Sequence, residues 1–186
     1  MTNSSNAANL RTMVREISAG GVVIRKRGGA WWMAAIEPPT EPPDPAKAIQ
    51  PTASQVDPLR HSVARRKRVL ALPKGLVDPG EKALETAIRE VYEETGVTAE
   101  LITKLGDSKY VYTRAWGDRQ RVFKIVSFYL MKYLSGRIND VTPAMRIEVA
   151  RAKWVRLEDA AKLLAYGGEK QMARRALDYV KAHPEL

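Results

Sequence analysis

Three glutamates in one short segment have the residue type and the spacing to hold a metal ion. Glu90, Glu93 and Glu94 stand at positions i, i+3 and i+4, so on a helix of 3.6 residues per turn they share one face. Three crowded carboxylates raise one another's pKa values, which indicates that a positive charge belongs beside them. Mg²⁺ takes oxygen ligands and bridges to phosphate groups. The spacing therefore predicts a helix whose acidic face can hold Mg²⁺ against a phosphate.

The same helix should have a second, apolar face. Its apolar residues recur at spacings of three and four, and they are Leu84, Ala87, Ile88 and Val91. We expect this face to pack on a sheet and so to fix the direction of the acids. The alternative is that the glutamates are solvated side chains of a surface helix, which is the usual role of a glutamate-rich turn.

The whole segment from Gly75 to Val97 reads GLVDPGEKALETAIREVYEETGV. Gly, five residues, Glu, seven residues, Arg-Glu-Val, one residue, Glu-Glu, one residue and Gly-Val is a full match to the signature of the Nudix hydrolase family. At average residue usage such a match arises by chance with odds on the order of 10⁻⁹ per starting point. The AGGVV and AKWVRLEDA segments also resemble the family, so the resemblance runs from about Ile17 to Ala165.

The resemblance implies a metal site and a reaction. It implies that Glu90, Glu93 and Glu94 hold Mg²⁺, for which Mn²⁺ can substitute, with the backbone carbonyl of Gly75 as a further ligand. The implied reaction is hydrolysis of a pyrophosphate bond. The metal would screen the phosphate charge and lower the pKa of bound water, while a carboxylate orients or deprotonates that water.

Other residues receive roles from the same resemblance. Glu81 and Arg89 are implied to be the supporting pair that joins the loop to the helix. The general base stays open between Glu90 and Glu148, which lies just before the AKWV segment and is otherwise a surface glutamate. Lys74, next to the loop glycine, would bind phosphate as a point charge, or else be a solvated loop lysine.

Aromatic and basic residues follow the signature. Tyr110, Tyr112 and Trp116 can stack on a base, although such residues more often pack within a sheet. A tyrosine at about this distance resembles diadenosine polyphosphate hydrolases more than ADP-ribose hydrolases. The basic side chains near the same turn would bind distant phosphates or be solvated, and they are Arg114, Arg119, Arg121 and Lys124.

These features favour a dinucleoside polyphosphate as substrate, with Tyr112 and Arg114 as substrate-binding residues. A sanitising hydrolase for oxidised or ordinary nucleoside triphosphates, an ADP-ribose hydrolase and an inositol pyrophosphate hydrolase remain alternatives. An alternative of a different class is a non-catalytic nucleotide-binding or nucleic-acid-binding module with the same fold. The third hypothesis is that the acidic helix is purely structural and binds no metal.

The elements that must position these residues alternate irregularly between strand and helix. We expect a hairpin around Gly28-Gly29, a strand over 69–72, and a helix from about Glu81 to Thr95 closed by Gly96. Further strands are expected at 97–105, 109–114, 120–133 and 152–157, and helices at 157–166 and 169–182. This order favours the α/β class: a Nudix-type α/β/α sandwich with a mixed sheet and a catalytic loop-helix.

Residues 1–15 are expected to be a mobile lead-in and 16–186 a single domain. Within that domain, the segment at about 37–67 holds seven of the 11 prolines and continues into the basic run Arg65–Arg68. We expect an extended or disordered insertion. If residues 68–74 form one strand, the basic run lies roughly 20 Å from the metals. An oligomer contact or weak nucleic-acid affinity would then suit it better than a role at the site.

Composition narrows the possible metal sites, partners and cellular location of the protein. The chain has no cysteine, which excludes disulfides and thiolate metal sites, and only two histidines, which disfavours a histidine-rich metal site. With 31 Lys and Arg against 21 Asp and Glu, the net charge is +10, which suits a polyanionic partner. No apolar run is long enough to span a bilayer. We expect a cytoplasmic protein, monomeric or homodimeric, with a nucleotide or polyphosphate as partner.

Overall fold

The computed structural model describes residues 13–39, 69–114 and 120–186. Its elements in chain order are β1 (Val14–Arg27), β2 (Ala30–Glu37), β3 (Lys74–Leu76), α1 (Ala83–Thr95), β4 (Val97–Thr113), β5 (Arg121–Gly136), the 3₁₀ turn η2 (Met145–Ile147), β6 (Arg151–Arg156), α2 (Leu157–Leu163) and α3 (Gly167–Ala182). Most of the expected insertion, residues 40–67, lies outside the described residues.

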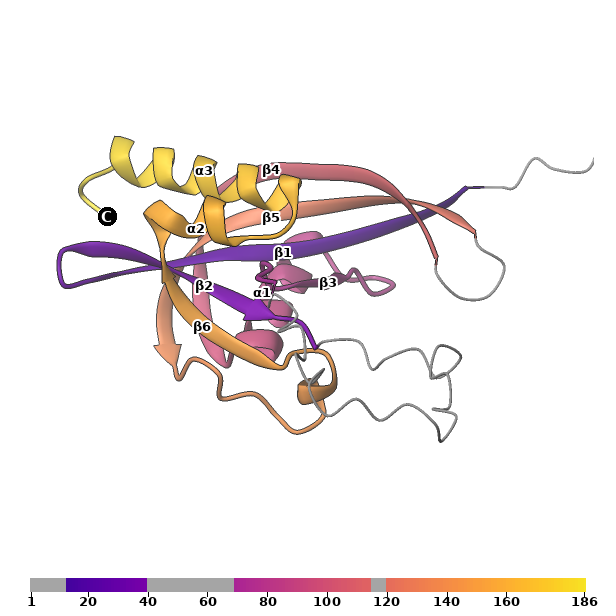
Figure 1. Cartoon of the computed structure of the whole chain (residues 1–186), viewed down its shortest axis with the longest axis horizontal. Coiled ribbons are helices and arrows are strands. Elements are labelled where there is room, and N and C mark those ends of the chain that lie inside the picture. Colours follow the sequence, from indigo (N-terminus) through magenta and orange to yellow (C-terminus); the bar gives the residue numbers. More distant parts are fainter. Residues whose placement is uncertain (1–12, 40–68, 115–119) are drawn as a thin grey trace, which may run out of the picture.

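The strands form one mixed sheet with α1 on one face and α2 and α3 on the other (Figure 1). The strand order is β4-β5-β1-β2-β6, and β3 pairs with β1. β1 is parallel to β5 and antiparallel to β2 and β3. β1 is central because its middle residues are apolar and alternate between the two cores: Val23 packs on the α1 side, and Val22 and Ile24 on the side of α2 and α3. The expected α/β/α sandwich with a mixed sheet is confirmed.

Several expected elements are confirmed with changed bounds. The β1–β2 hairpin turns at Gly28 and Gly29, which both have positive φ. α1 begins at Ala83 rather than near Glu81 and ends at Gly96, whose φ of 76° is left-handed. Strands expected at 97–105 and 109–114 are one strand, β4, because β5 pairs with its whole length. β1 begins at Val14, so residues 14 and 15 belong to the sheet and not to the lead-in.

The expected strand over 69–72 is wrong. Leu70 and Ala71 form only isolated bridges, to Leu164 and Ile36 respectively. Pro73 has no N–H to donate, and the regular ladder with β1 begins only at Lys74. Residues 68–74 are therefore not one strand, and the distance argued from that strand no longer applies. The basic run at 65–68 itself lies outside the described residues.

The apolar face of α1 is partly as expected. Ala87 and Val91 are buried against the sheet and Leu84 packs beside them, but Ile88 is 39% exposed. The buried stripe instead includes Thr86, whose hydroxyl donates to Glu81. This shift places the acids closer to the core than they would be on a fully solvated helix face. No helix in the described ranges combines the length and apolar character that a bilayer crossing requires.

Candidate functional site

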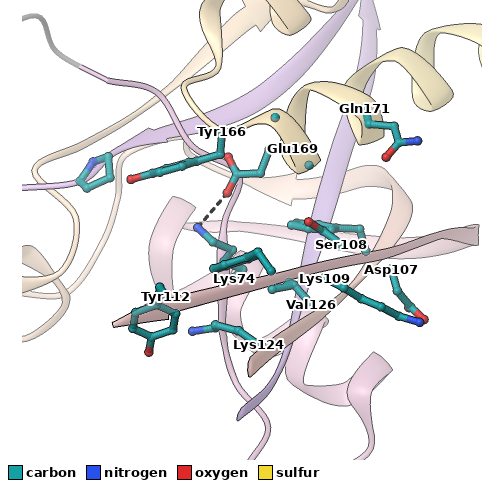
Figure 2. Close-up of a pocket in the computed structure, with 15 residues that line it drawn as sticks. Lys74, Asp107, Ser108, Lys109, Tyr112, Lys124, Val126, Tyr166, Glu169 and Gln171 are labelled. Carbon is teal, nitrogen blue, oxygen red and sulfur yellow. Dashed lines mark ion pairs between the residues drawn. The ribbon is translucent and has the colours of Figure 1, made fainter. Parts of the chain in front are cut away.

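β3 separates two polar regions, a cavity that its Lys74 faces and a cluster of acids that its Gly75 contacts. The cavity has a volume of about 660 Å³ and lies between β4, β5 and the start of α3. Figure 2 shows that Lys74, Lys124, Tyr112 and Tyr166 border it from these different elements. The lining combines tyrosines and lysines, which suit a phosphorylated aromatic ligand, with two acids, Asp107 and Glu169.

Lys74 is held in the cavity by a residue that the sequence did not single out. Its Nζ lies 2.9 Å from Oε1 of Glu169, and the other oxygen of Glu169 accepts a 2.9 Å hydrogen bond from the backbone N–H of Leu72. Nζ also donates to the Leu72 carbonyl at 3.4 Å and lies 5.7 Å from the ring centroid of Tyr166. Burial, the largest single effect, acts to lower the pKa of Lys74, but the charge and hydrogen bond of Glu169 together with the charge of Glu94 raise it overall.

Glu169 stands in the first turn of α3, 97 residues after Leu72, and its side chain is only 4% exposed. From the sequence, its position at a helix start after Gly167 and Gly168 indicates only that an acidic side chain there interacts favourably with the helix dipole. Nothing in the sequence pairs it with Lys74. The tertiary structure alone brings it to the site.

The two residues expected to bind substrate behave differently. Tyr112 borders the cavity and donates its hydroxyl to Oε2 of Glu16 at 3.0 Å. Arg114 donates to Oε1 of the same carboxylate at 2.9 Å and does not border the cavity. Arg114 and then Tyr112 lower the pKa of Glu16 against the opposing effect of burial. Arg114 thus reaches the site only through Glu16, and the expected Trp116 and Arg119 lie outside the described residues.

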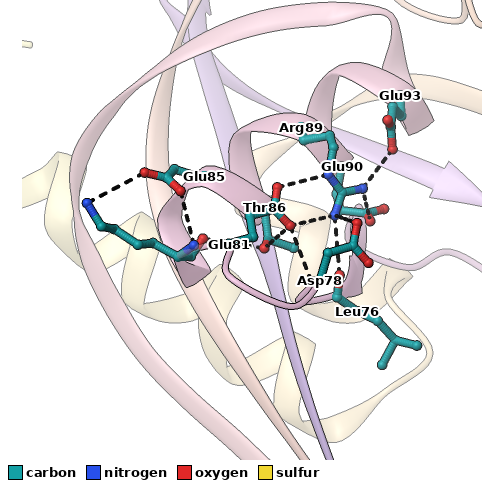
Figure 3. Close-up of polar contacts among 9 residues, drawn as sticks. Leu76, Asp78, Glu81, Glu85, Thr86, Arg89, Glu90 and Glu93 are labelled. Atoms are coloured by element: carbon teal, nitrogen blue, oxygen red, sulfur yellow. Dashed lines mark hydrogen bonds and ion pairs between the residues drawn. The ribbon is translucent and has the colours of Figure 1, made fainter.

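On the other side of β3, Arg89 connects the loop to the acids of α1, as Figure 3 shows. Its Nε and Nη2 donate to the two oxygens of Glu81 at 3.0 and 2.9 Å. Its Nη1 donates to Glu90 at 2.7 Å and to Glu93 at 3.0 Å, and Nη2 also reaches the Leu76 carbonyl at 3.3 Å. The hydrogen bond from Arg89, followed by that from Thr86, lowers the pKa of Glu81 to about 2.

Glu90 and Glu94 are the buried members of the acidic set, at 7% and 5% exposure. Gly75 lies so close to the Glu90 carboxylate that a Cβ at that position would overlap it. Glu94 accepts a 2.8 Å hydrogen bond from the backbone N–H of Lys74. Burial raises the pKa of Glu94 to about 8, and it also raises the pKa of Glu90 against the effect of Arg89.

Glu148 belongs to the same electrostatic environment although it is far away in the sequence. It is exposed at the end of η2, and its negative charge contributes to the raised pKa values of both Glu90 and Glu94. The fold therefore brings a later-loop acid near the acids of α1. This is the arrangement that the choice of base between Glu90 and Glu148 requires.

The acids beside β3 are the candidate site for a divalent cation. Within the described residues, no three acidic or histidine side chains gather around one point, and Arg89 instead binds Glu90 and Glu93. The donor chemistry nevertheless fits a hard cation: the set is made only of carboxylates, two of them buried, next to the backbone of Gly75. Arg89 provides in part the positive charge that the crowded acids need.

A family model described as NUDIX domain matches residues 58–176. The chain is 36% identical over 171 residues to the protein named MutT4 of Mycobacterium tuberculosis (strain CDC 1551 / Oshkosh), a match that covers 91% of this chain and 57% of MutT4. It is 29% identical over 114 residues to the asymmetrical bis(5'-nucleosyl)-tetraphosphatase of Mus musculus, covering 60% of this chain and 72% of that protein.

Among solved structures, a C. elegans Ap4A hydrolase binary complex aligns with a TM-score of 0.58 at 23% identity. The alignment covers 90% of this chain and 98% of that one, so the two share a fold. The chain spans little more than half the length of MutT4.

Proposed function

The chain belongs to the Nudix hydrolase family, and on that basis we propose that it is a Mg²⁺-dependent pyrophosphohydrolase of nucleoside diphosphate-linked substrates, with a dinucleoside polyphosphate as the preferred one. Members of this family typically depend on divalent metal ions and act on nucleotides. The observation that carries the proposal is the double role of Lys74. Its backbone N–H binds catalytic-helix residue Glu94, while its ammonium group lies in the aromatic and basic cavity. One residue thus joins the acids to a pocket that suits a nucleotide.

In the proposed reaction, a water oxygen forms a bond to one phosphorus and the bridging P–O bond breaks. Glu90, Glu93, Glu94 and the Gly75 carbonyl would hold the metal. When bound, Mg²⁺ would screen the phosphate charge and acidify the attacking water. The proton of that water would pass to Glu90 or Glu148, and the leaving phosphate would keep the electron pair of the broken bond.

Lys74 and the tyrosines would hold the part of the substrate that does not react. An ammonium group has three donors, of which Glu169 and the Leu72 carbonyl engage two. The third is available to a phosphate oxygen. The rings of Tyr110, Tyr112 and Tyr166 border the same cavity and offer faces for a base. Arg114 would act indirectly, by fixing Glu16 and with it Tyr112.

A second candidate is a sanitising hydrolase of nucleoside triphosphates. It is favoured by a shorter match, 51% identical over 53 residues, to the protein named 8-oxo-dGTP diphosphatase of Bacillus subtilis. ADP-ribose and inositol pyrophosphates are the remaining candidate substrates.

The test is a screen of dinucleoside polyphosphates, nucleoside triphosphates, ADP-ribose and inositol pyrophosphates with Mg²⁺, with both products identified by mass. We expect the highest kcat/KM for a dinucleoside polyphosphate, with asymmetric products. Preference for an oxidised deoxynucleoside triphosphate would support the second candidate. Failure to hydrolyse any of them under conditions in which the protein is folded would contradict the proposed function.

A further inference from the structure

A second cluster of charged and aromatic residues lies away from the acids, beside the β1–β2 hairpin. Its members border a cavity of about 470 Å³ and are Arg25 and Arg27 of β1, Trp32 of β2, and Trp154 and Arg156 of β6, here called the arginine–tryptophan cleft. They share one face because alternate residues of a strand point to the same side. The strand register places Arg25 opposite Trp32, and Trp32 opposite Arg156.

The positive charges of this cleft are poorly compensated. Within the described part of the chain, no carboxylate forms an ion pair with Arg25 or Arg27, and Arg156 pairs only with the exposed Glu158 at 3.3 Å. The buried Nε of Arg25 has no hydrogen-bond partner among the described residues. Burial, and next the charge of Arg27, lower the pKa of Arg25. Three like charges on neighbouring strands repel one another, so an anion would relieve them.

The aromatic rings give the cleft a second property. The Arg25 guanidinium lies 4.0 Å from the ring centroid of Trp154, and that of Arg156 lies 5.6 Å from the Trp32 ring. Trp32 and Trp154 are both only partly buried. Guanidinium groups thus lie next to partly exposed indoles, which is the combination that binds phosphates and bases of an unpaired strand.

The cleft is separate from the proposed catalytic site. Ala19 of β1 pairs with Gly75 beside the acids, and Arg25 lies six residues further along the same strand. At 3.3 Å per residue the two points are roughly 20 Å apart. In Figure 1 the β1–β2 hairpin, which provides part of the cleft, projects from one end of the sheet, whereas α1 lies against the middle of β1. A mononucleotide bound at the acids would not reach it.

We propose that the arginine–tryptophan cleft binds single-stranded nucleic acid, with phosphodiester groups on Arg27 and Arg156 and a base on the indole of Trp32. The net charge of +10 makes the chain attractive to a polyanion as a whole. The partly exposed indole of Trp32 favours a single strand over the alternatives: a duplex hides its base faces, and an acidic peptide has none.

The test measures binding of a fluorescent single-stranded oligonucleotide of roughly 12 nucleotides by anisotropy over a range of salt concentrations. The oligonucleotide carries a 5'-hydroxyl, so that the catalytic site has no terminal phosphate to bind. The double variant R27Q/R156Q should weaken binding about tenfold at low salt. It should also reduce the magnitude of the salt slope by about 1.4, because two single-strand phosphate contacts are lost.

The matched control is R174Q/K181Q, which removes two exposed charges from α3 on the opposite face of the sheet. It should bind nearly as the unmodified protein does. Equal loss in the two double variants would overturn the proposal, since general charge would then explain binding. W32L should lose most of the quenching of tryptophan fluorescence by the oligonucleotide, and unchanged quenching would contradict base stacking on Trp32.

Two competitors and one activity measurement complete the test. A duplex of the same sequence and poly-glutamate should each compete more weakly than the single strand, and equal competition by either would overturn the choice of a single strand. Hydrolysis of the preferred nucleotide by R27Q/R156Q should match that of the unmodified protein. A parallel loss of turnover would contradict the separation of the cleft from the catalytic site.

Discussion

The acids of α1 and the arginine–tryptophan cleft differ in how far their charges are neutralised by neighbouring groups. Around α1, Arg89 binds Glu81, Glu90 and Glu93, and Glu94 receives the backbone N–H of Lys74. In the cleft, Arg25 has a ring for a partner where a carboxylate would be expected. Both regions lie on the same face of one sheet, the acids beside the middle of β1 and the cleft beside its hairpin end.

The difference shows how each region can persist in a folded protein. Carboxylates as buried as Glu90 and Glu94 are costly unless positive charge or hydrogen bonds offset the lost hydration, and the loop-helix provides both. The partly buried Arg25 guanidinium is tolerated because this group is weakly hydrated and lies over the indole of Trp154. The first region is largely compensated internally, whereas the second has few countercharges of its own. The predictions below examine this contrast.

The largest effect is expected for E94Q. The glutamine keeps an acceptor for the Lys74 N–H but removes the charge, so kcat with Mg²⁺ should fall ~10³-fold. Because burial disfavours the charged form of Glu94, whose pKa is raised to about 8, the neutral variant should unfold at no lower temperature. Steady-state kinetics, calorimetric Mg²⁺ titration and thermal unfolding measure this. E85Q, an exposed position on the same helix, is the control. Full activity of E94Q would contradict the contrast between the two regions, since catalysis would then not depend on a cation bound by the acids.

A smaller loss is expected for G75A. The added Cβ would overlap the Glu90 carboxylate and push it from its position beside β3. A displacement of about 1 Å at a reacting centre costs about 10²-fold in rate. Equal activity of G75A and the unmodified protein would show that Glu90 need not lie there.

The next prediction concerns Glu169 of α3, whose carboxylate neutralises the charge of Lys74 in β3. E169Q should keep the hydrogen bond to Leu72 N–H but lose the ion pair, and KM for a polyphosphate substrate should rise about tenfold with a smaller change in kcat. E169A should in addition destabilise the fold by about 1–3 kcal/mol, because it also leaves the buried backbone N–H of Leu72 without an acceptor. Kinetics and denaturant unfolding separate the two effects. An unchanged KM in E169Q would remove the positioning role.

The smallest effect is expected for R25M. Methionine can occupy the space over Trp154 but cannot make the cation–π contact, so stability should fall by about 1 kcal/mol while nucleotide hydrolysis stays unchanged. Denaturant unfolding and steady-state kinetics measure this. A large loss of stability would mean that Arg25 is chiefly a structural residue, which would blur the contrast between the two regions.

Much of the fold was predictable where the signals are local. The β1–β2 hairpin follows from two adjacent glycines, and α1 from a pattern that repeats within four residues and ends at Gly96. The strand expected at 69–72 was wrong because its apolar run does not reveal that Pro73 interrupts the ladder. Propensity alone also could not show that β4 is a single long strand, since the continuous partner β5 decides it.

The order of acids and glycines in 75–97 by itself determined the loop, the helix and the face that the glutamates share, because helix periodicity needs only the chain's own neighbours. Tertiary structure decided the rest. Glu169 reaches Lys74, the charge of Glu148 reaches Glu90 and Glu94, and Arg25 meets Trp154 only because distant segments pair and pack. Such contacts depend on strand order and register, which side-chain spacing along the sequence does not encode.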